Sequence, residues 1–93
     1  MFYVYVLQCK SDNYRFYIGY TSDLKQRFAS HNAGENKATQ GHQWQLVYYE
    51  AYSIECAAIK RERRLKHHGN TKQALMKRIK EMLGLPSSKF PER

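Results

Sequence analysis

An apolar run near the start of the chain, residues 2–9 (FYVYVLQC), restricts the possible folds more than any other segment. Its residues are almost all β-branched, aromatic or otherwise apolar, and polar residues do not alternate with them. A half-exposed strand shows such alternation, whereas a strand that is covered on both faces does not. The run therefore predicts a strand with packed layers on both sides, and 93 residues leave room for one such domain.

Turn-forming and helix-capping residues divide the next part of the chain. Residues 10–15 (KSDNYR) predict a turn, and residues 16–20 (FYIGY) predict a second strand that forms a hairpin with the first. Thr21 or Ser22 is expected to cap a helix that Gly34 ends. The first half of the domain is thus a hairpin followed by one helix.

The second half contains one more strand and two helices. After a polar loop at 35–43, residues 44–52 (WQLVYYEAY) predict the third strand. Ser53 is expected to cap a helix that Gly69 ends, and Asn70 or Thr71 a helix that runs to about residue 83. The predicted fold is α+β, a three-stranded, mostly antiparallel sheet flanked by helices in the order β-β-α-β-α-α. We expect one domain at 1–84 and a loose tail at 85–93, which holds both prolines.

The charge of the chain favours a polyanionic partner. Sixteen Lys and Arg against eight Asp and Glu give a formal net charge of +8, and nine of the basic residues fall within 60–80. A surplus of this size in a small domain favours nucleic acid. An acidic membrane surface is not expected to be the partner, because the basic helices have no bulky apolar face free of core packing.

The cysteines and the N-terminal sequence indicate a cytoplasmic protein. Cys9 and Cys56 are far apart and have no C-x-x-C spacing, as is typical of reduced thiols. Met1 leads directly into the apolar run without a basic stretch, so no signal peptide is expected, and no segment has the length of a membrane span.

Three features do not fit a purely structural interpretation. Gly19 lies inside a predicted strand, where glycine often marks the close approach of another group. Arg27 and His31 lie one helical turn apart, although a half-buried His and an Arg at the edge of the core would also explain them. Glu62 is the only acid in residues 56–80. It could hold a cation, or it could form an ordinary i, i+4 pair with Lys66.

Together these residues resemble the GIY-YIG nuclease family, in particular its small stand-alone bacterial proteins that are similar to the nuclease domain of the bacterial excinuclease. The resemblance rests on Tyr3–Tyr5 (YVY), the run YIGYTSDLKQRFASHN that follows at Tyr17, and Glu62 on a later helix. It covers about residues 2–80. Tyr3 stands where the first motif usually has glycine.

The resemblance implies a metal-dependent endonuclease with five catalytic residues. Tyr5 and Tyr17 match the motif tyrosines, Arg27 the helix arginine, His31 a histidine found in some members, and Glu62 the metal ligand. Mg²⁺ or Mn²⁺ is the implied cofactor, and a single carboxylate suits Mg²⁺, which completes its shell with water and phosphate oxygens. Tyr17 would accept a proton from the attacking water, His31 would accept or relay it, Tyr5 would position the water and Arg27 would hold the phosphate.

Other basic residues are candidates for phosphate contacts outside the chemistry, with an exposed, solvated cation as the alternative for each: Lys25, Lys60, Arg61, Arg63, Arg64 and Lys66. Such contacts carry no sequence preference. We therefore expect the protein to select its substrate by structure rather than by sequence. The expected substrate is nucleic acid, and DNA rather than RNA.

Two other functions fit parts of the sequence. Many family members have an asparagine about a dozen residues after the glutamate, where this chain has Ala74, and the nearest candidate, Asn70, is a predicted helix cap. A nucleic-acid-binding module without catalysis, docking its last two helices on a duplex, is therefore the main alternative. A zinc protein is a weaker one, because the cysteines and histidines lack ligand spacing: Cys9, Cys56, His31, His42, His67 and His68.

Overall fold

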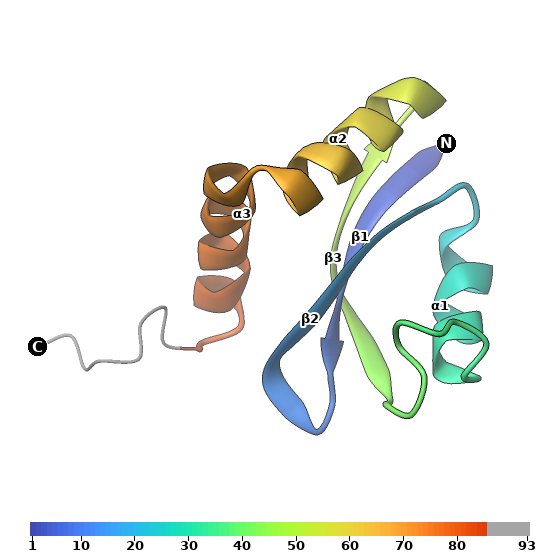
Figure 1. Ribbon diagram of the computed structural model, residues 1–93, viewed down its shortest axis with the longest axis vertical. Coiled ribbons are helices and arrows are strands. Elements are labelled where there is room, and N and C mark those ends of the chain that lie inside the picture. The colour runs from blue at the N-terminus through green and yellow to red at the C-terminus, as the bar shows by residue number, and fades with distance from the viewer. Residues whose placement is uncertain (86–93) are drawn as a thin grey trace, which may run out of the picture.

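A computed structural model describes residues 1–85 of the protein and has the expected order of elements within that range. The elements are β1 (Phe2–Cys9), β2 (Asp12–Thr21), α1 (Leu24–Asn32), β3 (Trp44–Tyr52), α2 (Glu55–His67) and α3 (Gly69–Met82) (Figure 1). The predicted tail lies, from residue 86 onward, outside the described residues. Across residues 1–85, no helix combines the length and the apolar character that crossing a membrane would require.

The apolar strand β1 lies at the centre of the sheet. The strand order is β2-β1-β3, and both pairs are antiparallel. Tyr5 pairs with Gly19 of β2 on one side and with Tyr49 of β3 on the other. The predicted α+β fold with a three-stranded antiparallel sheet is therefore confirmed.

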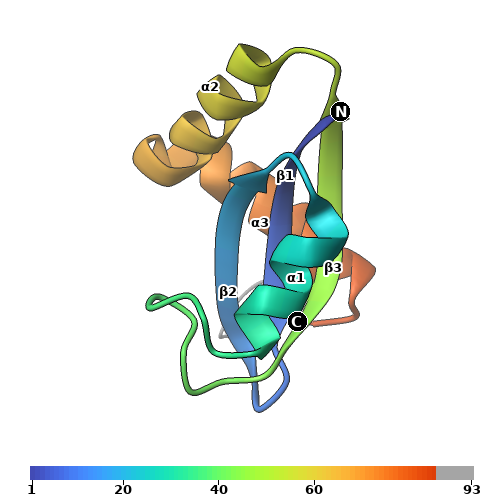
Figure 2. The same ribbon diagram turned by 90° about the vertical axis from the view of Figure 1, so that its right-hand side faces the viewer.

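Helices cover both faces of the sheet, as the composition of β1 predicts. α1 lies on one face and α2 with α3 on the other (Figure 2). Val4 and Val6 point towards α2 and α3, in a core that includes Ala58, Leu65, Leu75 and Ile79. Tyr5, Leu7 and Cys9 point to the opposite face, where they pack with Trp44, Leu24 and Phe28. Two small cores thus share one central strand, which fixes the position of every side chain on it.

The hairpin turn is shorter than the sequence predicts. Only Lys10 and Ser11 form the turn, and β2 begins at Asp12. The register shifts near this end, since Gln8 pairs with Phe16 and Cys9 with Asp12. The first four residues of β2 are exposed on both sides, so turn-type residues are tolerated there in an extended backbone.

The helix ends also differ from the prediction in three places. Asp23, and not Thr21 or Ser22, caps α1, because its carboxylate accepts a hydrogen bond from the backbone N–H of Gln26 at 3.1 Å. Ile54 takes the position predicted for Ser53 at the start of α2, without a side-chain cap. A single extended residue, His68, separates α2 from α3, so Gly69 begins α3 instead of ending α2, ahead of the predicted caps at Asn70 or Thr71.

Candidate active site

Two tyrosines and a histidine meet on the face of the sheet that α1 covers. The Tyr17 ring lies 6.4 Å from the Tyr5 ring and 5.0 Å from the His31 ring, centroid to centroid, and the Tyr5 and His31 rings are 5.7 Å apart. Tyr5 and Tyr17 share this face because Tyr5 pairs with Gly19, two residues along β2 from Tyr17. His31 enters from the last turn of α1.

Gly19 makes room for Tyr5 in this cluster. A Cβ atom at position 19 would lie 2.5 Å from Cζ and 3.0 Å from Cε2 of the Tyr5 ring, closer than side chains can approach. The close approach that a glycine in a strand suggested is therefore that of a neighbouring tyrosine. The glycine of the second motif and the tyrosine of the first are sterically coupled.

His31 is fully buried and bonded through both ring nitrogens. Nε2 lies 2.7 Å from the Tyr5 hydroxyl and Nδ1 2.7 Å from Oγ1 of Thr39. The Thr39 hydroxyl can donate to the carbonyl of Asn36 at 3.4 Å, which leaves its oxygen to accept from Nδ1–H. Nε2 then accepts the hydrogen bond from Tyr5. The network therefore assigns a neutral His31 with its proton on Nδ1.

The electrostatics of the cluster agree with this assignment. Burial lowers the pKa of His31, and the nearby Arg27 cation lowers it further. Burial also raises the pKa of Tyr5 far above its ordinary value, and the charges of Tyr17 and Glu62 act in the same direction while Arg27 opposes them. Tyr5 therefore keeps its proton and is not a base at neutral pH, so its hydroxyl has a proton to donate to His31.

Glu62 approaches the cluster from α2. Its carboxylate forms an ion pair with Lys66 at 3.2 Å, and the Lys66 ammonium lies 5.5 Å from the centroid of the Tyr17 ring. The side chain of Glu62 is 21% exposed, so it is open to solvent at one side. The charges of Glu62 and Arg27 both act on the Tyr5 hydroxyl, so these two residues lie in its neighbourhood. Tyr5, Tyr17 and His31 thus form the contacting cluster, with Arg27 of α1 and Glu62 of α2 near it.

The donor set fits a metal that needs few protein ligands. Within residues 1–85, no three His, Cys, Asp or Glu side chains converge into a cage. Glu62 offers one partly buried carboxylate, which pairs with the Lys66 ammonium near the Tyr17 ring. Mg²⁺ is often held by one or two carboxylates together with water and substrate oxygens. A divalent metal ion held by Glu62 would compete with the Lys66 ammonium, whose side chain is 40% exposed.

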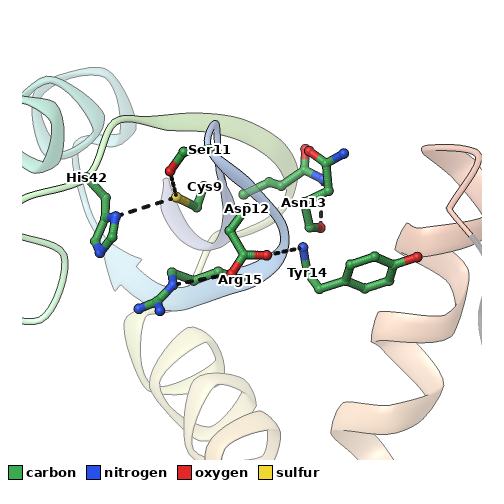
Figure 3. A network of polar contacts seen from close by, with 8 residues as sticks. Cys9, Ser11, Asp12, Asn13, Tyr14, Arg15 and His42 are labelled. Carbon is green, nitrogen blue, oxygen red and sulfur yellow. Dashed lines mark hydrogen bonds and ion pairs between the residues drawn. The ribbon is translucent and has the colours of Figure 1, made fainter. Parts of the chain in front are cut away.

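The predicted zinc ligands do not assemble in the described part of the chain. The shortest contact among them joins Sγ of Cys9 to Nδ1 of His42 at 3.7 Å, and Ser11 lies 3.3 Å from the same sulfur (Figure 3). The Ser11 hydrogen bond lowers the pKa of the Cys9 thiol. Cys56 is exposed on α2. No third ligand joins Cys9 and His42 among these residues.

The predicted phosphate contacts divide into two groups. Lys25 on α1 is exposed, as are four residues of α2: Lys60, Arg63, Arg64 and Lys66. Arg61 instead holds Glu50 of β3 through two hydrogen bonds of 2.9 Å. Tyr48 and Tyr52 donate to the same carboxylate at 2.7 and 2.6 Å. Arg61 is therefore directed towards β3 and not towards Tyr17.

Ala74 and Asn70 lie apart from the tyrosine cluster. Both line a pocket of about 410 Å³ together with Arg61 and Arg78, on the flank of α3 that faces the Glu50 network. The structure thus places neither the alanine nor the nearby asparagine beside Glu62.

Thr39 belongs to the site but gave no signal in the sequence. It is fully buried, and its carbonyl accepts a hydrogen bond of 3.0 Å from the indole of Trp44. Its segment, 35–43, has the composition of an ordinary polar loop. The contact with His31 joins residues from a loop and a helix, and a side-chain pairing of this kind leaves no periodic pattern.

Comparison with known proteins shows which family this chain is similar to. Residues 1–79 match the family model described as the GIY-YIG catalytic domain. A UPF0213 protein of Haloquadratum walsbyi is 38% identical over 73 residues, 76% of this chain and 80% of that protein. UPF0213 proteins of Streptococcus pyogenes are 37% identical over 75 residues, 78% of this chain and 79% of theirs. The solution NMR structure of a UPF0213 protein from Bacillus halodurans has a TM-score of 0.51 and 32% identity, with 86% of each chain covered. The family model and the relatives cover most of the chain, which therefore belongs to the GIY-YIG family.

Proposed function

We propose that this protein is a metal-dependent endonuclease that hydrolyses phosphodiester bonds. Its expected substrate is DNA, and its expected metal is Mg²⁺ or Mn²⁺. The observation that carries the proposal is the grouping of Tyr17, Arg27 and Glu62 at an open edge of a buried Tyr5–His31 pair. Membership of a family defined by its catalytic domain supports hydrolysis of nucleic acid.

The residues at the site divide the work of an in-line hydrolysis. Mg²⁺ held by Glu62 would supply Lewis-acid stabilisation of the phosphate and the leaving oxygen. Arg27 would hold phosphate oxygens through its planar guanidinium as negative charge develops. Tyr17, half-exposed, would accept the proton of the attacking water, while Lys66 near its ring provides a compensating positive charge.

Tyr5 and His31 would assist Tyr17 from the buried side of the site. Tyr5 is 1% exposed and His31 fully buried, so neither can receive a water directly from bulk solvent. In a relay, Nε2 of His31 would take the Tyr5 hydroxyl proton while the Tyr5 oxygen receives the proton that Tyr17 accepted from the water, so that Tyr5 ends neutral. Thr39 would then stabilise the charged ring by accepting from Nδ1–H.

The test is cleavage of labelled single-stranded, duplex, flap and branched DNA, and of RNA, with Mg²⁺, Mn²⁺ or EDTA. Tyr17→Phe and Glu62→Gln should each lower the cleavage rate by at least about 100-fold, as expected for loss of a catalytic base or a metal ligand. Tyr49→Phe and Glu81→Gln, which alter an exposed tyrosine and an exposed glutamate elsewhere, are the matched controls. Cleavage that persists in EDTA, or that survives both site variants, would contradict the proposal.

A non-catalytic nucleic-acid-binding module is the second candidate. It is favoured by Ala74, which stands where many family members have asparagine, and by the Lys66 ammonium on the carboxylate of Glu62. This function predicts salt-sensitive binding without cleavage of any substrate in either metal. The same set of substrates therefore decides between the two.

A further inference from the structure

A groove lined by lysines runs along the flank of α3 opposite to Ala74. Its volume is about 710 Å³, and it is lined by Gly69, Lys72, Gln73, Met76, Lys77 and Lys80. Residues 72, 76 and 80 are four apart, so they follow one line along the helix. Met76 at the floor is buried in the core, and the lysines form the walls.

The groove carries uncompensated positive charge. None of its lining residues is acidic. Among the described residues, no ion pair joins Lys72, Lys77 or Lys80 to a carboxylate. Three ammonium groups without carboxylate partners lie along one helix flank and repel each other. An anionic occupant would relieve this repulsion.

Tyr14 of β2 lies beside Lys80, on the side of the groove nearest the sheet. The Lys80 ammonium lies 5.7 Å from the centroid of the Tyr14 ring, which points from β2 towards α3 (Figure 3). The ring is 54% exposed, so this aromatic face is available to a ligand as well as to the lysine. Exposed aromatic rings beside cations are typical of surfaces that bind nucleic acid.

The groove and the candidate active site lie on opposite faces of the sheet, and the edge strand β2 separates them. Lys66, above the Tyr17 ring, precedes Gly69 of the groove by three residues. Along β2, Tyr14 precedes Tyr17 by three residues, so the two side chains lie on opposite faces of this strand. Because β2 is an edge strand, a nucleic-acid strand bound at Tyr17 could pass over its edge and reach Lys80 on the other face.

We propose that this groove binds the phosphate backbone of the nucleic-acid substrate, across the edge of β2 from the bond that is cut. The proposal rests on the proposed nuclease function and adds a second contact surface to it. The occupant is a polyanionic backbone, because the lining provides ammonium groups and one aromatic border but no array of acceptors that would recognise base edges. Contacts of this kind set affinity and position without sequence preference.

Binding without cleavage tests this surface separately from the chemistry. The measurement is fluorescence anisotropy of labelled duplex and single-stranded DNA in EDTA over a series of salt concentrations, with Tyr17→Phe as the parent protein. Lys72→Ala combined with Lys80→Ala removes two groove charges. Lys10→Ala combined with Lys37→Ala removes two exposed charges elsewhere and serves as the matched control.

The groove variant should bind roughly tenfold or more weakly near 0.1 M salt, and the slope of log K against log salt should fall by about 2. The control should retain most of the affinity and the slope of the parent. Equal affinities and slopes in the two double variants, with normal thermal melting, would overturn the groove while leaving the nuclease in place. A parent that binds no nucleic acid at low salt would overturn both.

Discussion

At the scale of single residues, the site is built from contacts that tolerate almost no change in size. The Tyr5 ring occupies the volume that a Cβ at Gly19 would need, and the Tyr5 hydroxyl reaches His31 from that position. Glycine at position 19 is therefore needed for space and not for backbone freedom, since the positive-φ residues within 1–85 are other glycines. Its place inside a strand predicted the close approach of another group, and the structure identifies that group as the Tyr5 ring.

Gly19→Ala should destabilise the fold by about 1–3 kcal/mol, the usual cost of overpacking a core. The new Cβ meets the Tyr5 ring, which has no free space to enter. The free energy of unfolding in urea measures the effect. Gly69→Ala is the control, because nothing lies within 4 Å of its Cβ position and alanine favours a helix, so it should be neutral or slightly stabilising. A Gly19→Ala protein as stable as this control would show that Tyr5 can move.

Thr39→Val should cost about 1–3 kcal/mol, because it removes the oxygen that accepts from Nδ1–H of a buried His31. Valine matches threonine in shape, so the loss is one of hydrogen bonding. Nitrogen NMR of the imidazole should show more of the Nε2–H tautomer, and urea unfolding gives the free energy.

Thr39→Ser keeps the hydroxyl and should restore the Nδ1–H tautomer. An unchanged tautomer in Thr39→Val would show that the threonine does not orient the histidine. The sequence could not predict this residue, because a threonine in a polar loop has many possible partners and the chain path that brings it to His31 is set by the loop as a whole.

At the scale of elements, α2 is oriented by contacts on two flanks. Arg61 binds Glu50 of β3, and the next residue, Glu62, pairs with Lys66, whose ammonium lies over the Tyr17 ring of β2. Near the start of the helix, Tyr20 donates a hydrogen bond to Glu55, which raises the pKa of Tyr20 to about 12. The position of Glu62 thus depends on anchors at both edge strands.

Arg61→Met should destabilise the protein by about 1–3 kcal/mol, less than for a fully buried pair because Arg61 and Glu50 are 29% and 16% exposed. The variant leaves the Glu50 carboxylate with only its two tyrosine donors. Arg63→Met, at an exposed position of the same helix, is the matched control. Equal unfolding free energies for the two variants would show that the Glu50 network does not hold α2 in place.

The sequence predicted the elements wherever burial leaves a pattern, and failed where it does not. The unbroken apolar run of β1 and the helix end at Gly34 follow local rules, and Gly34 has a positive φ. The first four residues of β2, 12–15, are exposed, and their turn-type composition did not predict a strand there. Arg61 was expected to face the substrate, whereas its neighbour Glu50 on β3 is distant in sequence and could not be paired with it from spacing alone.

At the scale of the whole molecule, two cores share one central strand. Each core has one hydrogen-bonded titratable group at its edge. His31 lies in the layer between the sheet and α1, and Glu50 anchors the layer between the sheet and α2. Loss of either group's hydrogen bonds should therefore weaken the entire fold, because β1 belongs to both cores.

Stability should accordingly fall in two stages as the solution is acidified. The pKa of His31 is lowered in the folded state by burial and by Arg27, so the unfolded chain binds a proton first and stability declines below about pH 6.5. The pKa of Glu50 is also lowered, because its hydrogen bonds to Arg61 and the two tyrosines outweigh its burial, which acts in the opposite direction. Its contribution is present above the ordinary glutamate pKa of about 4.3 and is lost as the pH falls through the lower folded value.

Unfolding in urea between pH 3 and pH 8, in EDTA, should separate the two stages. His31→Gln removes the titration near neutral pH and should flatten the upper part of the curve, whatever its effect on absolute stability. Glu50→Gln should flatten the lower part and leave the upper part intact. A curve whose upper part is the same with and without His31 would mean that the imidazole titrates equally in the folded and unfolded chains. The buried, neutral His31 that the Tyr5 and Thr39 hydrogen bonds require would then be excluded.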